Sequence, residues 1–212
     1  MDLLTQLSTQ ATPITTDAYL LAGFALADET QLVADLHSIL ITSPPRQMMT
    51  PMGCTMSAAI TNCGSLGWVS DAKGYRYTAL NPSNGLPWPS LPDSFLRLAD
   101  LAAAQVGFVN FVPDACIINQ YQVGARMGLH QDKDELDFSQ PIVSVSLGIP
   151  AIFQFGGAKR QNKPINLTLH HGDVVVWGGV ARLHFHGIKP LKLHHHASLG
   201  ALRYNLTFRK AG

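Results

Sequence analysis

The sequence predicts a mostly β protein, built on an antiparallel sandwich or barrel with flanking helices. Three observations support this fold class. From residue 115 onward, short apolar or alternating runs are separated by glycine, proline or asparagine, which is typical of short antiparallel strands. Two earlier segments have helical spacing of apolar residues. A chain of 212 residues with 46% hydrophobic content can bury its own core, so we expect a single domain over 1–212.

Two helices are expected before the strand-rich part. The first should begin at Asp28, which stands three residues before Gln31 in a capping-box pattern ahead of an apolar stripe. It should end before Pro44, because proline disfavours helical geometry in the residue before it. The second should begin near Asp93 and end near Gly107. We expect both helices to serve packing.

The segment between these helices is rich in proline, glycine and asparagine, yet it also carries aromatic residues such as Trp68, Tyr75 and Tyr77. Such a stretch is typical of short strands and ordered loops. Aromatic side chains on ordered loops favour a recognition surface over a rigid scaffold. Plain packing of a small lobe is the alternative interpretation.

The strand-rich part follows the second helix. Its candidate strands, read from apolar runs and turn residues, are 116–121, 142–147, 152–155, 165–170, 174–177, 182–188 and 202–209.

Charge and composition exclude several function classes. Lys and Arg number 15 against 14 acids, so the chain is not a long-range electrostatic binder of polyanions, and any nucleic-acid contact must be local. The first basic residue is Arg46, so we expect no secretory signal, and no apolar run approaches membrane-spanning length. Three cysteines without close pairing fit reduced thiols. We therefore expect a cytoplasmic protein with no membrane contact.

His130 and Asp132 form the first candidate metal motif. In an extended segment this spacing points both side chains to the same side. A third ligand is expected from a later strand, and parity alone leaves both His184 and His186 open. Two imidazoles and one carboxylate on one face of an octahedron are the ligands of non-haem Fe(II) oxygenases, although zinc is also possible. A solvated acidic loop around Asp132 is the alternative.

The segment 203–209 alternates strictly between polar and apolar residues. In an ordinary antiparallel strand the polar face would meet water. Inside a barrel it would point into the lumen, where Arg203 and Arg209 would need anionic partners. Their backbones would lie roughly 20 Å apart, a geometry that suits a keto diacid approached from opposite ends. On the strand 116–121, Asn119 and Tyr121 share one face and offer hydrogen-bond donors.

At these residues the chain resembles the AlkB family of iron(II) and 2-oxoglutarate-dependent nucleic-acid dealkylases. The resemblance extends over nearly the whole length. The segments that carry it are 56–68 (MSAAITNCGSLGW), 113–121 (PDACIINQY), 129–135 (LHQDKDE), 141–157 (PIVSVSLGIPAIFQFGG), 171–179 (HGDVVVWGG) and 203–209 (RYNLTFR).

The resemblance implies a double-stranded β-helix core, a relative of the jelly roll. Residues from about 1 to 90 would form an N-terminal extension and nucleotide-recognition lid, and residues from about 91 to 212 a helix and the core. It also resolves the third ligand, so that the implied iron ligands are His130, Asp132 and His186. The residues implied to hold 2-oxoglutarate are Asn119, Tyr121, Ser144, Arg203, Asn205 and Arg209.

The implied reaction is oxidative demethylation of bases such as 1-methyladenine and 3-methylcytosine, with release of formaldehyde. It consumes O2 and converts 2-oxoglutarate to succinate. The expected substrate is alkylated single-stranded or short double-stranded DNA, with RNA as a second option, and the expected protein is a monomer. The implied substrate contacts are Trp68 as a stacking plate, Asp134 as a selector of cationic bases, and Met56, Tyr75, Tyr77, Lys133, Glu135 and Arg160.

Two other functions stay open at this point. One keeps iron and 2-oxoglutarate but hydroxylates a protein or a small molecule. The other is a non-catalytic metal-binding barrel. The resemblance gives no role to the histidine run formed by His194, His195 and His196.

Overall fold

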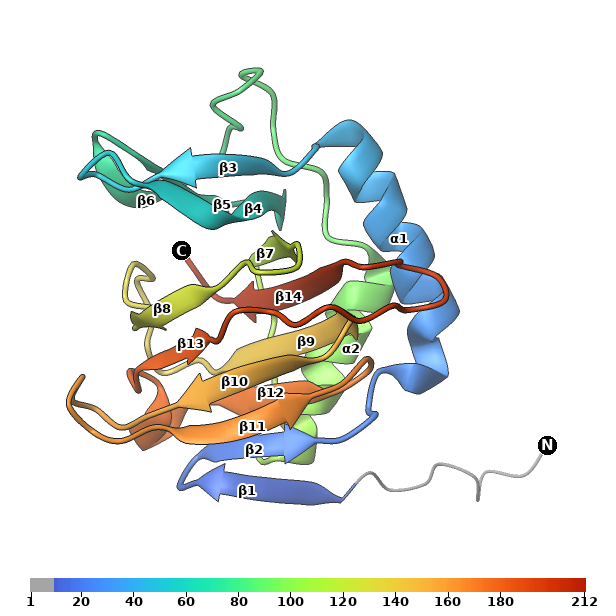
Figure 1. Ribbon diagram of the computed structural model, residues 1–212, viewed down its shortest axis with the longest axis vertical. Helices are drawn as coiled ribbons and strands as arrows, with labels where there is room; N and C mark the ends of the chain where they lie inside the picture. Colours follow the sequence, from blue (N-terminus) through green and yellow to red (C-terminus); the bar gives the residue numbers. More distant parts are fainter. Residues whose placement is uncertain (1–9) are drawn as a thin grey trace.

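The computed structural model describes residues 10–212, in which two antiparallel sheets face each other and two helices cover the outer face of the larger one (Figure 1). The strands of the larger sheet are, in spatial order, β1 (Ala11–Thr15), β2 (Ala18–Leu21), β12 (Val174–Trp177), β9 (Ile142–Gly148), β14 (Arg203–Arg209), β7 (Ala115–Tyr121), β4 (Thr55–Gly64) and β3 (Arg46–Met49). Those of the smaller sheet are β11 (Ile165–Leu169), β10 (Ala151–Phe155), β13 (His186–Ile188) and β8 (Met127–His130). The predicted jelly-roll architecture is confirmed.

The two helices, α1 (Glu29–Thr42) and α2 (Asp93–Gln105), form one core with the larger sheet. Their buried residues pack against side chains from β9 and β14, and the rings of Phe95 and Phe208 meet edge to face at 5.7 Å. Burial of this apolar surface is what fixes helices of this length, which are marginal alone in water. Both predicted helices are therefore confirmed, with ends within two residues of those expected.

The predicted capping box of the first helix is wrong. A short 3-10 turn, η1 (Leu26–Asp28), precedes α1, and the Asp28 side chain makes no capping hydrogen bond. Its carboxylate instead pairs with Arg97 at 2.6 Å, and the Gln31 amide donates to Asp35. Because η1 leads directly into α1, the Asp28 side chain does not cap the helix and can pair with Arg97 on α2.

A second apolar core fills part of the space between the two sheets. It is built from aromatic side chains of β10 and β12, with Phe153, Phe155 and Trp177 at ring distances of 5.8 to 6.3 Å. Alternate side chains of β14 point to opposite faces of the larger sheet. The apolar residues of β14 face the helices, while its polar residues point between the sheets, and all seven are buried. The interpretation of this strand as half-solvated is therefore wrong.

The C-terminal strands confirm the predicted runs with one exception. The expected strand 182–188 exists only as β13, because residues 182–185 form no strand and the turn that begins with the 3-10 helix η2 (Gly179–Ala181) continues to His184. His184 is therefore not in a strand, and the parity argument that placed it beside His186 does not hold. The strand β8 was not predicted, and its pairing with β13 sets His130 opposite His186.

The segment between the helices contains four strands. β3 and β4 extend the larger sheet beyond β7, and the separate hairpin of β5 (Gly67–Asp71) and β6 (Gly74–Thr78) packs beside them. Gly67 is required at its position, because a Cβ there would lie 2.3 Å from the Trp88 ring. The loop between β6 and α2 contains residue 90, and the division of the chain near that residue stays a prediction. None of the helices described is long and apolar enough to span a membrane.

Candidate active site

His130, Asp132 and His186 come together between the open ends of the two sheets. His130 ends β8 and His186 begins β13, so the pairing of these strands brings the two imidazoles to a ring distance of 4.4 Å. The loop after β8 carries Asp132 to them. Its oxygens lie 3.7 Å from His130 Nε2 and 3.6 Å from His186 Nε2. One ligand atom from each residue lies within 4.8 Å of the others.

The other ring nitrogens decide whether this group fits a metal. His130 Nδ1 lies 2.9 Å from the Gly128 carbonyl oxygen, and His186 Nδ1 lies 3.1 Å from the His184 carbonyl oxygen. A carbonyl oxygen only accepts, so each Nδ1 carries the proton and donates it. Both Nε2 lone pairs are then free and face Asp132. This is the tautomer that metal-binding histidines adopt, so the donor set fits a divalent ion such as Fe(II).

The protonation states agree with that reading. Burial lowers the pKa of His130 to about 4, and the neighbouring His186 adds to the shift, so His130 is neutral at pH 7. Burial acts to raise the pKa of Asp132, but Arg209 and His186 outweigh it and hold the pKa well below its usual range. Asp132 is therefore ionised, so His130 and Asp132 present one neutral nitrogen and one anionic oxygen.

A buried network of charges supports the carboxylate. Arg209 donates to Asp132 Oδ2 from both Nε and Nη2, and its Nε also lies 3.2 Å from Glu135 Oε1. Arg182 Nη2 lies 3.2 Å from Glu135 Oε2, and the Tyr77 hydroxyl donates to Glu135 Oε1 at 2.7 Å. The two arginines thus balance the two carboxylates. Glu135 was predicted as a substrate contact. It lines the cavity with Oε1 hydrogen-bonded to Tyr77, while Oε2 is within ion-pair distance of Arg182 and has no hydrogen-bond partner in the described chain.

The cavity beside this group has a volume of about 580 Å³ and reaches deep between the sheets. Arg203 is at its inner end and is 1% exposed. Its Nη2 donates to Ser146 Oγ at 3.1 Å, while Nε and Nη1 have no hydrogen-bond partner in the described part of the chain. Burial lowers the pKa of Arg203 to about 10. An unpaired buried guanidinium is costly, and a bound anion would satisfy it.

Polar side chains line the cavity between Arg203 and the metal group. Asn205 Nδ2 donates to Ser144 Oγ at 2.8 Å, and the Asn119 amide lies 3.4 Å from Asn205 Oδ1. Burial raises the pKa of Tyr121 to about 12, so its hydroxyl stays a neutral donor. The cavity wall therefore contains all six residues predicted for 2-oxoglutarate, namely Asn119, Tyr121, Ser144, Arg203, Asn205 and Arg209.

Two polar residues that contact this group were not predicted. Thr207 donates to Asn205 Oδ1 at 2.9 Å and lies on the polar face of β14 with the arginines. Ser146 follows Ser144 by two residues on β9 and contacts Arg203. Thr207 shares the polar face of the alternating segment 203–209 with Asn205, and Ser146 shares a strand face with Ser144, which the resemblance implied, so parity in the sequence carried the signal.

The mouth of the cavity is lined by the β5–β6 hairpin. The ring of Trp68 stacks on that of Tyr75 at 5.5 Å with an interplanar angle of 13°. Trp68 Nε1 donates to Asp134 Oδ2 at 2.8 Å, which ties the hairpin to the loop after Asp132. Burial raises the pKa of Tyr77 well above its usual value, so Tyr77 remains a hydroxyl donor to Glu135.

The structure brings the remaining predicted substrate residues to the same mouth. Met56, Lys133 and Arg160 line the cavity, and the Arg160 guanidinium lies over the Phe185 ring at 5.0 Å. Lys133 and Arg160 are exposed. His184, the other candidate third ligand, lies instead beside Phe155, with a ring distance of 5.7 Å.

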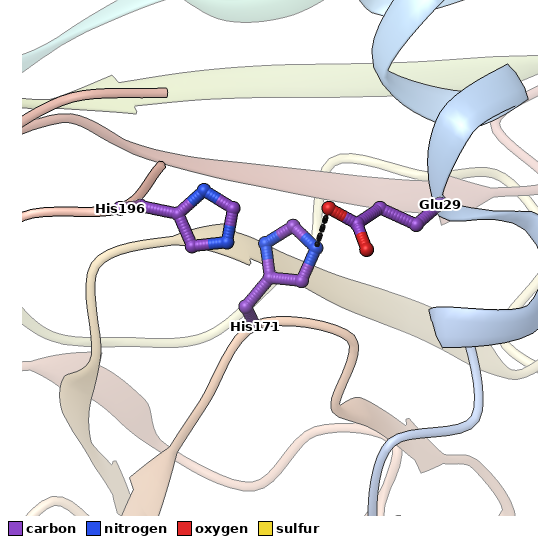
Figure 2. A group of neighbouring side chains, drawn as sticks. All are labelled: Glu29, His171 and His196. Carbon is purple, nitrogen blue, oxygen red and sulfur yellow. Dashed lines mark ion pairs between the residues drawn. The ribbon is translucent and has the colours of Figure 1, made fainter. Parts of the chain in front are cut away.

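A second group of metal-binding residue types lies outside the cavity. His171, His196 and Glu29 also place ligand atoms within 4.8 Å of one another, and Figure 2 shows the two rings side by side, with Glu29 next to His171. The rings stack at 4.1 Å with an interplanar angle of 17°. Of the histidine run, His196 alone belongs to this group.

Comparisons with known proteins agree with the site. A family model described as the 2OG-Fe(II) oxygenase superfamily matches residues 17–209. The chain is 53% identical over 200 residues to "Alpha-ketoglutarate-dependent dioxygenase AlkB" of Escherichia coli, covering 94% of this chain and 93% of that protein. It is 45% identical over 171 residues to the AlkB homolog of Caulobacter vibrioides, covering 80% of this chain and 76% of that protein.

A solved structure gives the same result for the fold. "The structure of OsALKBH1" matches with a TM-score of 0.82 and 28% identity, covering 95% of this chain and all of that chain. The matched family model and these relatives together show that the chain belongs to the AlkB family of the 2OG-Fe(II) oxygenase superfamily.

Proposed function

We propose that this protein removes methyl groups from N-alkylated bases of nucleic acid by iron- and 2-oxoglutarate-dependent oxidation. The observation that carries the proposal is that one cavity holds both a metal-ready triad and an unpaired buried arginine. The relatives' names support the reaction class, since they describe an alpha-ketoglutarate-dependent dioxygenase and, in the mouse and human relatives, a "Nucleic acid dioxygenase".

His130, Asp132 and His186 would hold the iron, leaving open positions on the side of the cavity. When bound, iron and 2-oxoglutarate supply the oxidising chemistry with O2, and the methyl group leaves as formaldehyde. The chain itself supplies ligand geometry. The Gly128 and His184 carbonyls keep both Nε2 atoms free of protons, and Arg209 keeps Asp132 ionised.

Arg203 would bind the carboxylate of 2-oxoglutarate that lies farthest from the metal. It is buried at the inner end of the cavity and has two N–H groups without partners in the described chain. A guanidinium offers these donors in a fork that matches a carboxylate. Tyr121 and Asn119 line the same wall as neutral hydrogen-bonding groups. The co-substrate would thus span the cavity from Arg203 to the triad.

The aromatic mouth would receive a flipped base. A base must leave its stack before its methyl group can reach the triad, and a lesion that blocks pairing lowers that cost. The Trp68 ring stacks on Tyr75 and lines the same cavity as His130, so its other face would be available to a base. Bases such as 1-methyladenine and 3-methylcytosine are cationic, and the Asp134 carboxylate beside Trp68 would favour them by charge.

The polymer would be held by a small number of contacts. Lys133 and Arg160 are exposed at the mouth and suit two phosphates. The formal net charge of +1 gives no basic stripe, so the contacts are local. Such local contacts favour single-stranded or short double-stranded DNA, with RNA as a second substrate. The proposal also places the protein in the cytoplasm as a monomer.

The test is formaldehyde release from an oligonucleotide that contains 1-methyladenine or 3-methylcytosine, with and without ferrous ion and 2-oxoglutarate. We expect release that needs both additions and equals the succinate formed. An Arg203→Met variant should raise the KM for 2-oxoglutarate by about tenfold or more, because a charge-assisted pair is lost. Succinate formation without formaldehyde from any methylated oligonucleotide would indicate a protein or small-molecule hydroxylase instead.

A further inference from the structure

The metal-ligand loop has no regular structure of its own. Residues 131–141 form neither helix nor strand, yet they carry Asp132 and Glu135. A loop holds a side chain in place only as well as its anchors hold the loop. The anchor at its start is the Gln131 amide, which donates to the Leu183 carbonyl at 2.5 Å. The backbone N–H of Leu136 donates to the Ala211 carbonyl.

Arg182 is the third anchor and reaches the loop at three points. It follows η2 directly and its side chain is 3% exposed. Its Nη1 donates to the Asp132 carbonyl oxygen at 2.9 Å, and its Nε donates to the Gln140 carbonyl oxygen at 3.1 Å. Its Nη2 lies 3.2 Å from Glu135 Oε2. One rigid guanidinium therefore fixes the backbone of the metal ligand, a buried carboxylate and the far end of the loop.

Arg182 also affects how the charge of Arg209 is divided between Asp132 and Glu135. Asp132 and Glu135 are both within reach of Arg209, which donates to the first and lies 3.2 Å from the second. With Arg182 present, Glu135 has a cation of its own. Without it, two buried carboxylates would compete for Arg209, and the Asp132 carboxylate would turn away from the histidines whenever Arg209 moved toward Glu135.

We propose that Arg182 is a positioning residue that holds Asp132 in the orientation in which its carboxylate faces His130 and His186. The proposal rests on the iron site of the proposed function and extends it to a residue that lies outside the ligand set. Arg182 acts through the Asp132 carbonyl and through Glu135. It does not line the cavity, so it would touch neither the metal nor the co-substrate.

The test measures Mn²⁺ binding to the metal-free full chain, with Arg182→Met and Arg182→Lys compared with the wild type. Outer partners of metal ligands typically cost about 10- to 100-fold in affinity when they are removed. We expect a loss in that range for Arg182→Met. Arg182→Lys should recover part of it, because an ammonium can satisfy Glu135 or one carbonyl but lacks the fork that spans all three.

The matched control is Arg97→Met, which removes an exposed arginine–aspartate pair far from the cavity. Its Mn²⁺ affinity should equal that of the wild type. Circular dichroism and thermal melting separate a folding defect from a positioning defect. If Arg182→Met does not fold, Arg182→Lys carries the test, because its charge is kept.

The failures of the two proposals are distinguishable. If the wild type binds no Mn²⁺, or if Asp132→Ala binds it as well as the wild type does, the metal site of the proposed function is wrong. If the wild type binds Mn²⁺ at this site and folded Arg182→Met and Arg182→Lys bind it with unchanged affinity, the site stands and the role of Arg182 is overturned.

Discussion

The described chain contains two compact groups that each consist of two histidines and one carboxylate. The groups differ in the hydrogen-bond partner of each histidine Nδ1 atom. In the cavity, His130 and His186 direct Nδ1 at backbone carbonyl oxygens. Outside it, His171 Nδ1 accepts the Gly148 backbone N–H at 2.9 Å, and His196 Nδ1 accepts from the Ser198 backbone N–H at 3.4 Å. Carbonyl partners free both Nε2 atoms for a metal. N–H partners place the ring proton on Nε2, where a metal would have to bind.

The angle between the two histidine rings also differs between the two groups. The cavity rings are tilted by 52°, so their lone pairs can converge, whereas the outer rings are stacked at 17°. His171 Nε2 lies 3.2 Å from Glu29 Oε1 (Figure 2). The comparison teaches that residue type and distance do not define a metal site by themselves. The backbone group behind each ring decides the tautomer, and the tautomer decides what the ring can bind.

The largest difference is expected from removing one carboxylate at each group. Asp132→Ala takes away a ligand and leaves Arg209 with a single carboxylate, so demethylation should fall by more than the roughly 100-fold cost of losing an outer partner. Glu29→Ala removes a half-exposed carboxylate from the outer group and should change activity by about twofold or less. Formaldehyde release under saturating co-substrate measures both. Equal losses of formaldehyde release in the two variants would contradict the claim that only the cavity group binds the metal.

A smaller effect on stability should separate two replacements of His171. Asparagine offers an acceptor near the position of Nδ1 and can keep the Gly148 N–H satisfied, whereas glutamine reaches the position of Nε2 and leaves that buried N–H without a partner. An unsatisfied buried donor costs about 1–3 kcal/mol. His171→Gln should therefore be less stable than His171→Asn by about that amount in urea unfolding. The reverse order would mean that His171 acts mainly through Glu29.

A pH dependence of folding is also expected from the cavity group. The pKa of folded His130, about 4, lies below its usual value of 6.5, so between these values the unfolded chain binds more protons. Stability should consequently be full above pH 6.5 and fall as the pH drops toward 4. Burial, and then His196, also lower the pKa of His171, which adds to the same slope. In His130→Gln, urea unfolding of the metal-free protein should show a shallower fall, and an unchanged slope would assign the effect to other groups.

Local pattern was sufficient to predict much of the fold. The alternation of 203–209 predicted a strand with one polar and one apolar face, and the structure confirms both faces. The same rule reached Asn119 and Tyr121, because side-chain parity in a strand is a property of the backbone. The expected strand 182–188 failed because residues 181–184 form a turn, in which the His184 N–H donates to the Ala181 carbonyl, and the alternation did not reveal it.

The site could be predicted only in part for the same reason. The spacing of His130 and Asp132 marked two ligands, but the third was chosen by family resemblance, since parity left His184 and His186 equal. The physical choice comes from the pairing of β8 with β13, a long-range contact. Arg182 begins the expected strand 182–188 but lies outside β13, and its partners lie 42 to 50 residues earlier in the chain. Such contacts are visible only in three dimensions.

The most direct test of the account is the position of a bound metal. Crystals of the metal-free protein soaked with Mn²⁺ should show an anomalous-scattering peak within bonding distance of His130 Nε2, His186 Nε2 and an Asp132 oxygen. The same crystals should show no peak beside His171. A peak between His171, His196 and Glu29, or none among His130, Asp132 and His186, would contradict the claim that the ring tautomers select the site.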